Sequence, residues 1–251
     1  MENNTSKIFG LRAIIEAINS GQEIEKVYLQ KELKGELAST LNHLIKENKI
    51  SSSYVPVEKL NKLSKSDQNR TQNHQGAVAK ISSITFADLE ELIENTLNKS
   101  KTPLFLLLDQ ISDVRNLGAI IRTAECTGVD GIIIPTHGSA PVNSEAIKTS
   151  AGAAFKIPIC KVNHILDAIY QLKAIDIQIV AITEKTNQTV YDIDFSKPTA
   201  LVLGSEHKGI STSVLKNADA KGKLPLLGEI ESLNVSVACG VALYEVVRQR
   251  M

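Results

Sequence analysis

The sequence predicts an α/β protein in which a small N-terminal α/β lobe precedes a larger lobe built on a mostly parallel sheet. Two observations lead to this class. Short apolar runs that are typical of strands alternate along the 251-residue chain with segments of helical periodicity. Hydrophobic residues make up 43% of the chain, which is enough to bury a sizeable core. Repeated strand–helix units imply parallel strands with helices on both faces of the sheet.

The N-terminal lobe is expected to cover residues 1–82. Leu11, Ile14 and Ile18 recur at helical spacing and Gly21 follows them, so a helix is predicted between Leu11 and Gly21. The remaining elements are predicted in the order strand 27–29, helix 33–45, strand 50–55, helix 57–63, polar loop 64–73 and strand 74–79.

Residues 84–100 form an acidic segment whose apolar side chains recur at helical spacing: Leu89, Leu92, Ile93 and Leu97. This pattern predicts an amphipathic helix, and residues 83–102 are assigned to a linker between the lobes. The larger lobe then covers residues 103–251. Its strands are predicted at 104–108, 131–134, 157–162, 177–183 and 200–203, and its helices at 116–127, 146–153, 164–173 and 211–218.

The stretch from Leu201 to Gly240 contains the clearest candidate site. One apolar run stops at Gly204, and polar side chains follow it: Ser205, Glu206, His207 and Lys208. A second apolar run, 224–227, ends at Gly228 and is interpreted as another strand end. Ligands of α/β sheets lie at the carboxyl ends of strands, so these loops are expected to bind one. Ser232 or Asn234 could equally be a plain helix cap.

Three sequence motifs resemble those of a known protein family. N-L-G-A-I-I-R-T-A begins at Asn116, L-G-S-E-H-K-G-I at Leu203, and P-L-L-G-E-I-E-S-L-N-V-S-V-A at Pro225. In this order they resemble the motifs of the SpoU/TrmH family of RNA ribose 2′-O-methyltransferases. F-G-L-R-A-I-I-E-A-I from Phe9 and H-Q-G-A-V-A from His74 look like the substrate-binding domain that precedes the catalytic domain in a branch of this family.

The resemblance implies a fold that periodicity alone does not. Periodicity indicates a Rossmann-type sheet, whereas family members have an α/β knot of the SPOUT class, with the last helix threaded through a deep trefoil knot. The resemblance also implies an N-terminal domain like ribosomal protein L30e, and a homodimer that pairs through the knotted lobe.

The implied reaction is methyl transfer from S-adenosylmethionine to a ribose 2′-hydroxyl of RNA. The matched polar positions are expected to form one catalytic site: Asn116, Arg122, Glu206, Ser232 and Asn234. Arg122 would hold the phosphate beside the target ribose, because a guanidinium binds phosphate oxygens in a bidentate manner. Ser232 and Asn234 would fix the ribose or the donor by hydrogen bonds.

Glu206 would orient Arg122 or Asn116. The residues alone also allow plainer interpretations, in which Arg122 pairs with Glu125, three positions along the same helix, and Glu206 is an exposed loop carboxylate.

S-adenosylmethionine is expected to lie against the strand ends, where backbone amides and carbonyls can recognise an adenine edge. The positions are Thr183, Gly204, Leu224 and Leu233, although both leucines could equally belong to the core. No metal is expected. The three cysteines, Cys126, Cys160 and Cys239, are far apart and lack the spacing of a metal site or a disulfide framework.

Four residues are expected to contact RNA: Arg12, Arg70, His74 and Arg115. Arg12 could instead lie on a solvated helix face, and His74 could be a turn partner. The chain carries 28 basic and 28 acidic residues, a balance that counts mildly against a nucleic-acid enzyme. Residues 1–83 hold 12 Lys and Arg against 9 Asp and Glu, so the basic excess of +3 lies in the N-terminal lobe.

The two-lobe layout most resembles family members that methylate 23S ribosomal RNA, at a guanosine of the peptidyl-transferase P loop. A tRNA D-loop guanosine and a ribosomal RNA adenosine are the alternative substrates, and a non-catalytic RNA-binding protein is the alternative of a different class. A nucleotide-binding oxidoreductase would need G-x-G-x-x-G, and a serine hydrolase G-x-S-x-G; Gly204, Ser205 and Gly209 form neither pattern. The polar start and the lack of an 18-residue apolar run favour a cytoplasmic protein.

Overall fold

The computed structural model describes residues 7–65, 73–81, 84–206, 208–230 and 232–251. The chain divides into two compact units, Met1–Thr85 and Phe86–Met251. The first unit ends at Thr85, whereas the boundary of the N-terminal lobe predicted from the sequence is 82.

The first unit is built on a four-stranded mixed sheet in the order β1-β4-β2-β3. Strands β2 and β3 are parallel, whereas β4 runs antiparallel to both β1 and β2. The strands are β1 (Lys7–Phe9), β2 (Ile24–Gln30), β3 (Ser52–Val55) and β4 (Ala77–Ile81). The three-residue β1 was not predicted from the sequence, because so short a run has no detectable periodicity.

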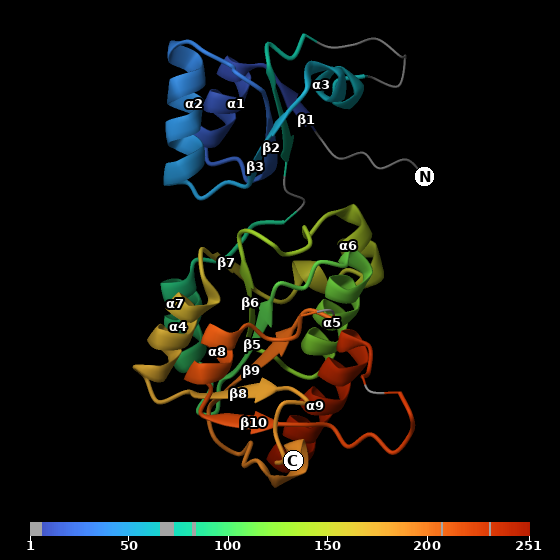
Figure 1. Cartoon of the computed structure of the whole chain (residues 1–251). Coiled ribbons are helices and arrows are strands. Elements are labelled where there is room, and N and C mark those ends of the chain that lie inside the picture. Colours follow the sequence, from blue (N-terminus) through green and yellow to red (C-terminus); the bar gives the residue numbers. More distant parts are fainter. Residues whose placement is uncertain (1–6, 66–72, 82–83, 207, 231) are drawn as a thin grey trace. The chain divides into compact units, whose positions relative to one another are not determined.

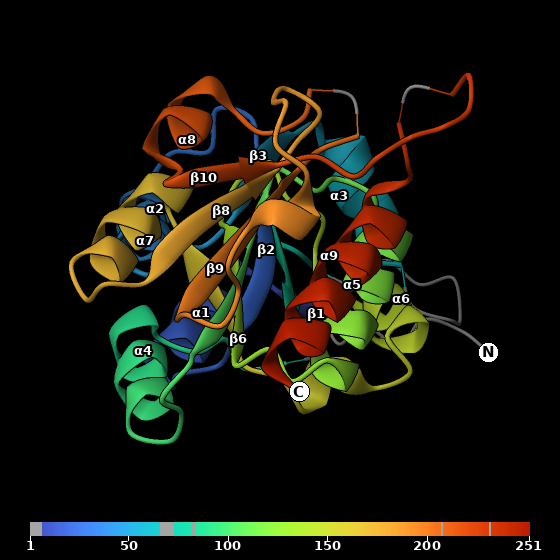
Figure 2. The same ribbon diagram turned by 90° about the horizontal axis from the view of Figure 1, so that it is seen from below.

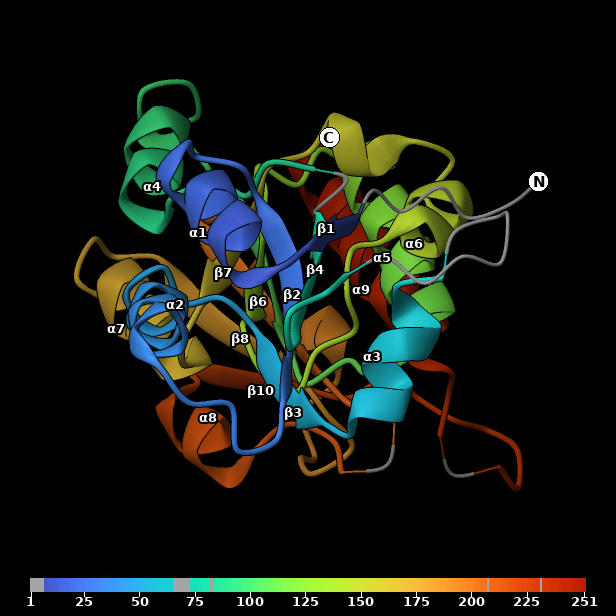
Figure 3. The same ribbon diagram turned by 90° about the horizontal axis from the view of Figure 1, so that it is seen from above.

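Helices cover both faces of this sheet, but unequally (Figures 1 and 3). On one face, α1 (Leu11–Asn19) and α2 (Glu36–Glu47) enclose the main apolar cluster, which includes Ile14, Val27 and Leu41. On the other face, the shorter α3 (Val57–Leu63) packs through Leu60 on a small cluster. The seven-residue α3 therefore leaves part of its face uncovered.

The second unit is built on a six-stranded sheet in the order β10-β8-β9-β5-β6-β7, in which every neighbouring pair is parallel. The predicted parallel α/β sheet is confirmed. Strand β9 lies between β8 and β5, so the order differs from the Rossmann order that periodicity alone indicates. The strands are β5 (Leu104–Asp109), β6 (Gly131–Pro135), β7 (Ile159–Val162), β8 (Gln178–Ile182), β9 (Thr199–Gly204) and β10 (Ala220–Gly222).

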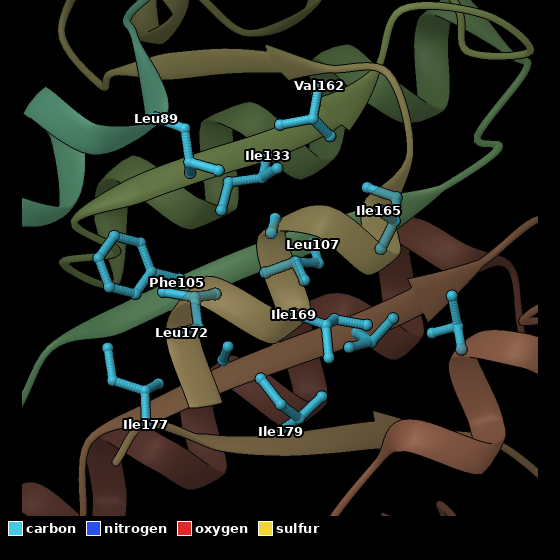
Figure 4. Packing of buried hydrophobic residues seen from close by; sticks show 14 of the residues in the cluster. Leu89, Phe105, Leu107, Ile133, Val162, Ile165, Ile169, Leu172, Ile177 and Ile179 are labelled. Carbon is cyan, nitrogen blue, oxygen red and sulfur yellow. The ribbon is translucent and has the colours of Figure 1, made fainter. Parts of the chain in front are cut away.

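Two groups of helices cover the two faces of the parallel sheet (Figure 2). One face carries α5 (Val114–Cys126), α6 (Ser144–Thr149) and α9 (Val235–Arg250); the other carries α4 (Leu89–Leu97), α7 (Ile165–Lys173) and α8 (Thr212–Asn217). The core on the α4 and α7 side contains Phe105, Leu107 and Ile169, with Leu89 from α4 (Figure 4). The central strands are buried on both faces, as expected for a parallel sheet.

Three sequence-based assignments need correction. The predicted linker helix exists as α4, but Leu89, Leu92 and Ile93 place it in the core of the second unit rather than in a separate linker. Residues 224–227 are not a strand: the strand is β10, and Leu227 is 100% exposed. The helix predicted at 146–153 stops at Thr149, and a 3₁₀ turn follows at Ala153–Phe155, because Ala151 and Gly152 adopt the positive φ values +51° and +84°.

The last turn of α9 is fastened to loops that precede β9 and β5. Arg250 donates hydrogen bonds to the backbone carbonyls of Thr102, Phe195 and Lys197 at 2.6–2.8 Å. Gln249 accepts from the Phe195 amide and donates to Ile193. Both ends of α9 are therefore fixed by backbone groups or side chains from distant segments. The trefoil knot itself stays an implication of the family resemblance.

Candidate active site

The loop after β9 turns back sharply on the strand. A Cβ atom added to Gly204 would lie 2.1–2.4 Å from the backbone of Gly209 and Ile210, closer than any real side chain can approach. Gly209 has φ +66° and donates its amide to the Ser205 carbonyl at 2.8 Å. The close approach expected at Gly204 is thus made by the chain itself, and it fixes the position of Glu206.

Three of the five predicted catalytic side chains form a closed hydrogen-bonded triangle. Asn116 Nδ2 donates to Glu206 Oε1 at 3.0 Å, and Asn234 Nδ2 donates to the same oxygen at 2.7 Å. Asn234 Nδ2 also donates to Asn116 Oδ1 at 3.1 Å. The three residues come from α5, the β9 loop and the start of α9, which lie 28 to 118 residues apart in the sequence. Glu206 therefore contacts Asn116, one of the two partners expected for it.

Asn234 is also the N-cap of α9. Its Oδ1 accepts from the Ser236 amide at 2.9 Å and from the Ser236 hydroxyl at 2.6 Å. From the sequence, Asn234 could be either a helix cap or a site residue. In the structure, its amide side chain has both roles. Because Oδ1 is occupied by α9, the Nδ2 donor must face Glu206 and Asn116.

All four positions expected at the methyl donor line one cavity of about 450 Å³. Thr183 comes from the end of β8, Gly204 from the end of β9, and Leu224 and Leu233 from the segment between β10 and α9. Neither leucine is core, since Leu233 is 41% exposed and Leu224 is half-buried. Ser232 and Glu206 line the same cavity, so Ser232 lies near the triangle without a hydrogen bond to it among the described residues.

A second, smaller cavity of about 310 Å³ adjoins the first. It is lined by Asn116 and by the loop after β5, Ile111–Asp113, and it shares Glu206 and Val235 with the larger cavity. Glu206 of the triangle and Val235 in the first turn of α9 therefore line both cavities, whereas Asn116 lines only the smaller one.

Arg122 is exposed on α5 and, among the described residues, forms neither an ion pair nor a hydrogen bond. The plainer interpretation, an ion pair with Glu125, is not what the structure shows, since Glu125 faces Lys156 at 3.9 Å. The structure brings Asn116, Glu206 and Asn234 together but records no contact between Arg122 and them.

The residues expected to contact RNA differ in their surroundings. Arg12 is exposed on α1, and Arg115 pairs with Glu145 at 3.1 Å on the surface of the second unit. His74 is only 9% exposed, and both its ring nitrogens are engaged, by Asn61 at 3.0 Å and the Gly76 amide at 3.0 Å. This is the turn-partner alternative, and it leaves His74 little capacity to contact RNA. Arg70 lies outside the described residues.

The larger cavity has a charged rim that was not predicted from the sequence. Glu184, Lys185 and Lys208 line it, and Leu226 adds an exposed apolar side chain. Glu184 and Lys185 immediately follow Thr183 at the end of β8, so the strand-end rule that selected Thr183 could have found them. Among the residues with described positions, no group of His, Cys, Asp and Glu could hold a metal ion.

Comparisons with known proteins identify the family of both units. The SpoU rRNA Methylase family matches residues 103–244, and the family of RNA 2′-O ribose methyltransferase substrate-binding domains matches residues 7–87. YacO of Bacillus subtilis, named as a TrmH family tRNA/rRNA methyltransferase, is 34% identical over 251 residues, covering 100% of this chain and 98% of that protein. A Staphylococcus saprophyticus protein with the same family name is 36% identical over 97% of this chain and 95% of its own length.

Solved structures are similar over nearly the whole chain. The SpoU methyltransferase AviRb of Streptomyces viridochromogenes has a TM-score of 0.60 and 25% identity, covering 97% of this chain and 89% of that one. AviRb has also been solved with the cofactor AdoMet. The AdoMet-bound rRNA methyltransferase of Sinorhizobium meliloti has a TM-score of 0.61 and 25% identity, covering 98% of this chain and 87% of that one. In the described part of the chain, no helix has the length and apolarity to cross a membrane.

Two family matches that together span residues 7–244, and relatives more than 30% identical over almost their full length, lead to one assignment: the chain belongs to the SpoU rRNA methylase (SpoU/TrmH) family.

Proposed function

We propose that the protein is an S-adenosylmethionine-dependent RNA ribose 2′-O-methyltransferase. One observation carries the proposal: Glu206, which accepts hydrogen bonds from both Asn116 and Asn234, lines two adjoining cavities. A transfer enzyme has to hold two reactants in line, and positioning of this kind can supply roughly 7–11 kcal/mol of the barrier in the best cases.

The larger cavity fits the methyl donor. Its volume of about 450 Å³ lies within the range of small-molecule sites, about 300–1,000 Å³. Leucine side chains and the backbone at Gly204 offer surfaces for an adenine ring, while Glu184 and Lys185 offer charges for an amino-acid group. When bound, S-adenosylmethionine supplies a methyl group on a sulfonium, which leaves as a neutral thioether.

The smaller cavity is proposed to hold the target ribose. Asn116 and Glu206 face it, and the triangle fixes both side chains before RNA arrives. Asn116 and Glu206 can then hold ribose hydroxyls by hydrogen bonds without first being ordered. Such pre-organised polar groups are the usual source of transition-state stabilisation.

Arg122 is proposed to bind the phosphate beside the target ribose. It is exposed and has no partner within the described residues, so its five N–H donors are free to engage phosphate oxygens. An arginine keeps its proton in a protein, so we assign it an electrostatic role rather than that of the base.

We propose a guanosine of the peptidyl-transferase P loop in 23S ribosomal RNA as the substrate. The support is the two-unit layout and the ribosomal RNA substrates named for similar proteins. Mapping of ribosomal 2′-O-methyl groups in a strain that lacks the protein tests this choice. Full methylation of the P-loop guanosine in that strain would exclude it and leave a tRNA D-loop guanosine or a ribosomal adenosine as candidates.

A non-catalytic RNA-binding protein is the alternative of a different class. Such a protein would have no reason to retain a donor cavity beside an ordered polar triangle. Isothermal titration calorimetry with S-adenosylmethionine separates the two. Saturable heat with a stoichiometry of one donor per chain is expected, and the absence of any heat would support the silent alternative.

We also propose that the protein is a homodimer that pairs through the second unit. The support is a shallow apolar groove along α9, where Tyr191, Val237, Val241 and Tyr244 are 38–58% exposed. Exposed apolar patches of this kind mark association surfaces. Light scattering at micromolar concentration should give twice the chain mass of 27.3 kDa. A monomer under these conditions would contradict the proposal.

A further inference from the structure

Three lysines lie side by side on the sheet of the first unit. In the strand register, Lys7 of β1 is opposite Lys80 of β4, and Lys80 is opposite Lys26 of β2. Directly opposite residues project from the same face with Cβ atoms roughly 4.5–5.5 Å apart. The order β1-β4-β2 therefore places three lysine side chains in a continuous row on one face, here called the lysine row.

The lysine row lies on the face that α3 covers only in part. A neighbouring apolar row on this face packs with Leu60 of α3. It consists of Phe9, Val78 and Tyr28. The opposite face is closed by α1 and α2, as Figure 3 shows. All three lysines of the row are partly exposed rather than buried. The row therefore begins where the cover of α3 ends.

Within the described part of the chain the row has no ion-pair partner, although burial and the charge of Glu25 raise the pKa of the neighbouring Tyr28. Among the described residues, none of the ion pairs includes Lys7, Lys26 or Lys80. Lys7 Nζ donates to the Leu63 carbonyl at 3.0 Å, which uses one of its three donors. Like charges directly opposite each other destabilise a sheet, so the arrangement works against folding. Lysines on edge strands protect against aggregation, but β4 and β2 are central strands, so that explanation does not cover Lys80 or Lys26.

An aromatic ring extends the row toward α3. The Tyr28 ring lies 5.5 Å from Lys26 Nζ and 5.8 Å from Lys59 Nζ, so it holds both ammonium groups by cation–π contacts. Lys59, on α3, is likewise absent from the ion pairs of the described residues. Four positive charges thus gather on one face of a unit whose net charge is small.

We propose that the lysine row with Lys59 binds the phosphate backbone of the substrate RNA. This inference rests on the proposed function, because it assigns the RNA surface of the same enzyme. A row of ammonium groups is suited to a polyanion and not to bases, since lysine is a point charge without planar donor geometry. The RNA would supply the ion-pair partners that these lysines lack among the described residues. The contact is expected to be independent of RNA sequence and to weaken with salt.

The test uses the full chain and two matched double variants. Lys26→Gln with Lys80→Gln removes two charges from the row, and Lys34→Gln with Lys46→Gln removes two exposed charges elsewhere in the same unit. Fluorescence anisotropy at a series of KCl concentrations measures binding to a labelled hairpin from the 23S ribosomal P loop and to an unrelated hairpin of equal length.

For the row variant, the slope of log affinity against log salt should fall by roughly 1.4–1.8, since each phosphate contact contributes about 0.7 to 0.9. The loss should be the same for both hairpins, and the control variant should keep the wild-type slope. At saturating RNA the methyl-transfer rate constant kcat should be retained while KM for RNA rises. An unchanged slope in the row variant would overturn the inference.

The melting temperature distinguishes an RNA surface from a structural feature. Removal of two like charges should leave it equal to or above that of the wild type. A lower melting temperature would make the row structural and would also overturn the inference. The proposed function fails separately, if the wild type transfers no methyl group to any RNA or does not bind S-adenosylmethionine. The salt slope remains measurable in that case.

Discussion

The two sheets of this molecule present their polar groups in different places. In the six-stranded parallel sheet, the central strands are buried on both faces, and the polar side chains of the site follow the strand ends. In the four-stranded mixed sheet, lysines stand on the strands themselves, on a face that α3 only partly covers. The helices packed on each sheet therefore determine which part of that sheet is accessible to a ligand.

The difference matches two kinds of ligand. A strand-end cavity encloses a small molecule and can fix a reacting atom within a fraction of an ångström. An open row of charges cannot do so, but it can follow an extended backbone whose position need not be precise. We expect catalysis to depend on the second unit, and RNA affinity to depend strongly on the first.

The largest effect should come from Arg122→Ala. Loss of a group that stabilises charge near the reacting atoms lowers kcat by about 10²–10³-fold. Donor affinity, measured by calorimetry, should stay near the wild-type value, because Arg122 is not among the residues that line the donor cavity. Arg122→Lys keeps the charge without the bidentate geometry, and it should recover only part of the rate. A loss of donor affinity in Arg122→Ala would contradict this prediction, because it would place Arg122 at the donor cavity instead of at the RNA phosphate.

Gly204→Ala tests whether the tight turn after β9 requires a residue without a Cβ atom. A Cβ there meets backbone at 2.1–2.4 Å, so the loop that carries Glu206 must shift. We expect a loss of roughly 1–3 kcal/mol in the free energy of unfolding and a weakened donor site. Gly228→Ala is the control, since its Cβ would meet nothing within 4 Å. Equal donor affinities in the two variants would show that the turn is not needed to form the cavity.

Asn234 allows its two roles to be separated. Asn234→Ala removes both the cap and the Glu206 contact, so it should cost about 1 kcal/mol of stability and most of the activity. Asn234→Ser can still cap α9 but has no amide to reach Glu206, so we expect near wild-type stability with low activity. Thermal unfolding and methyl transfer, measured on both variants, check this. Full activity in Asn234→Ser would remove the triangle from the mechanism.

The smallest effect concerns the cysteines, all of which lie in the second unit. Burial raises the pKa of Cys239 to about 12 from its ordinary 9.0, so the folded state binds this proton more tightly than the unfolded state. The resulting stability is complete below pH 9 and is lost as the pH rises toward 12.

At pH 8 a maleimide should label exposed Cys126 alone, and Cys160 and Cys239 only after the second unit opens. Fast labelling of all three would contradict the buried core.

Sequence periodicity was sufficient for the buried parallel strands, since runs such as Leu104–Leu108 have few alternatives. It failed at residues 224–227, where four apolar or proline residues resemble a strand but are half-buried or exposed, and Leu224 and Leu226 line the larger cavity. Periodicity describes burial and does not distinguish burial in a core from contact with a ligand.

The candidate site could be predicted in part from the sequence, whereas the lysine row could not. Asn116 and Asn234 are 118 residues apart, and in the sequence only the family motifs connect them. No sequence signal placed Lys80 between Lys7 and Lys26. That alignment depends on strand order and on the irregular register near Glu25, both of which are set by tertiary packing. The turn role of His74 likewise depends on Asn61 and on the local backbone.

The triangle has a consequence for biosynthesis. Asn116 and Glu206 leave the ribosome before Asn234 does, and the amide of Asn234 is the only described group that bonds to both of them. A nascent chain that has released β5 through β9 therefore has a nearly complete sheet and a carboxylate with one of its two amide donors. For the proposed transfer reaction, we expect the site to become complete only late in translation, after the whole first unit has emerged.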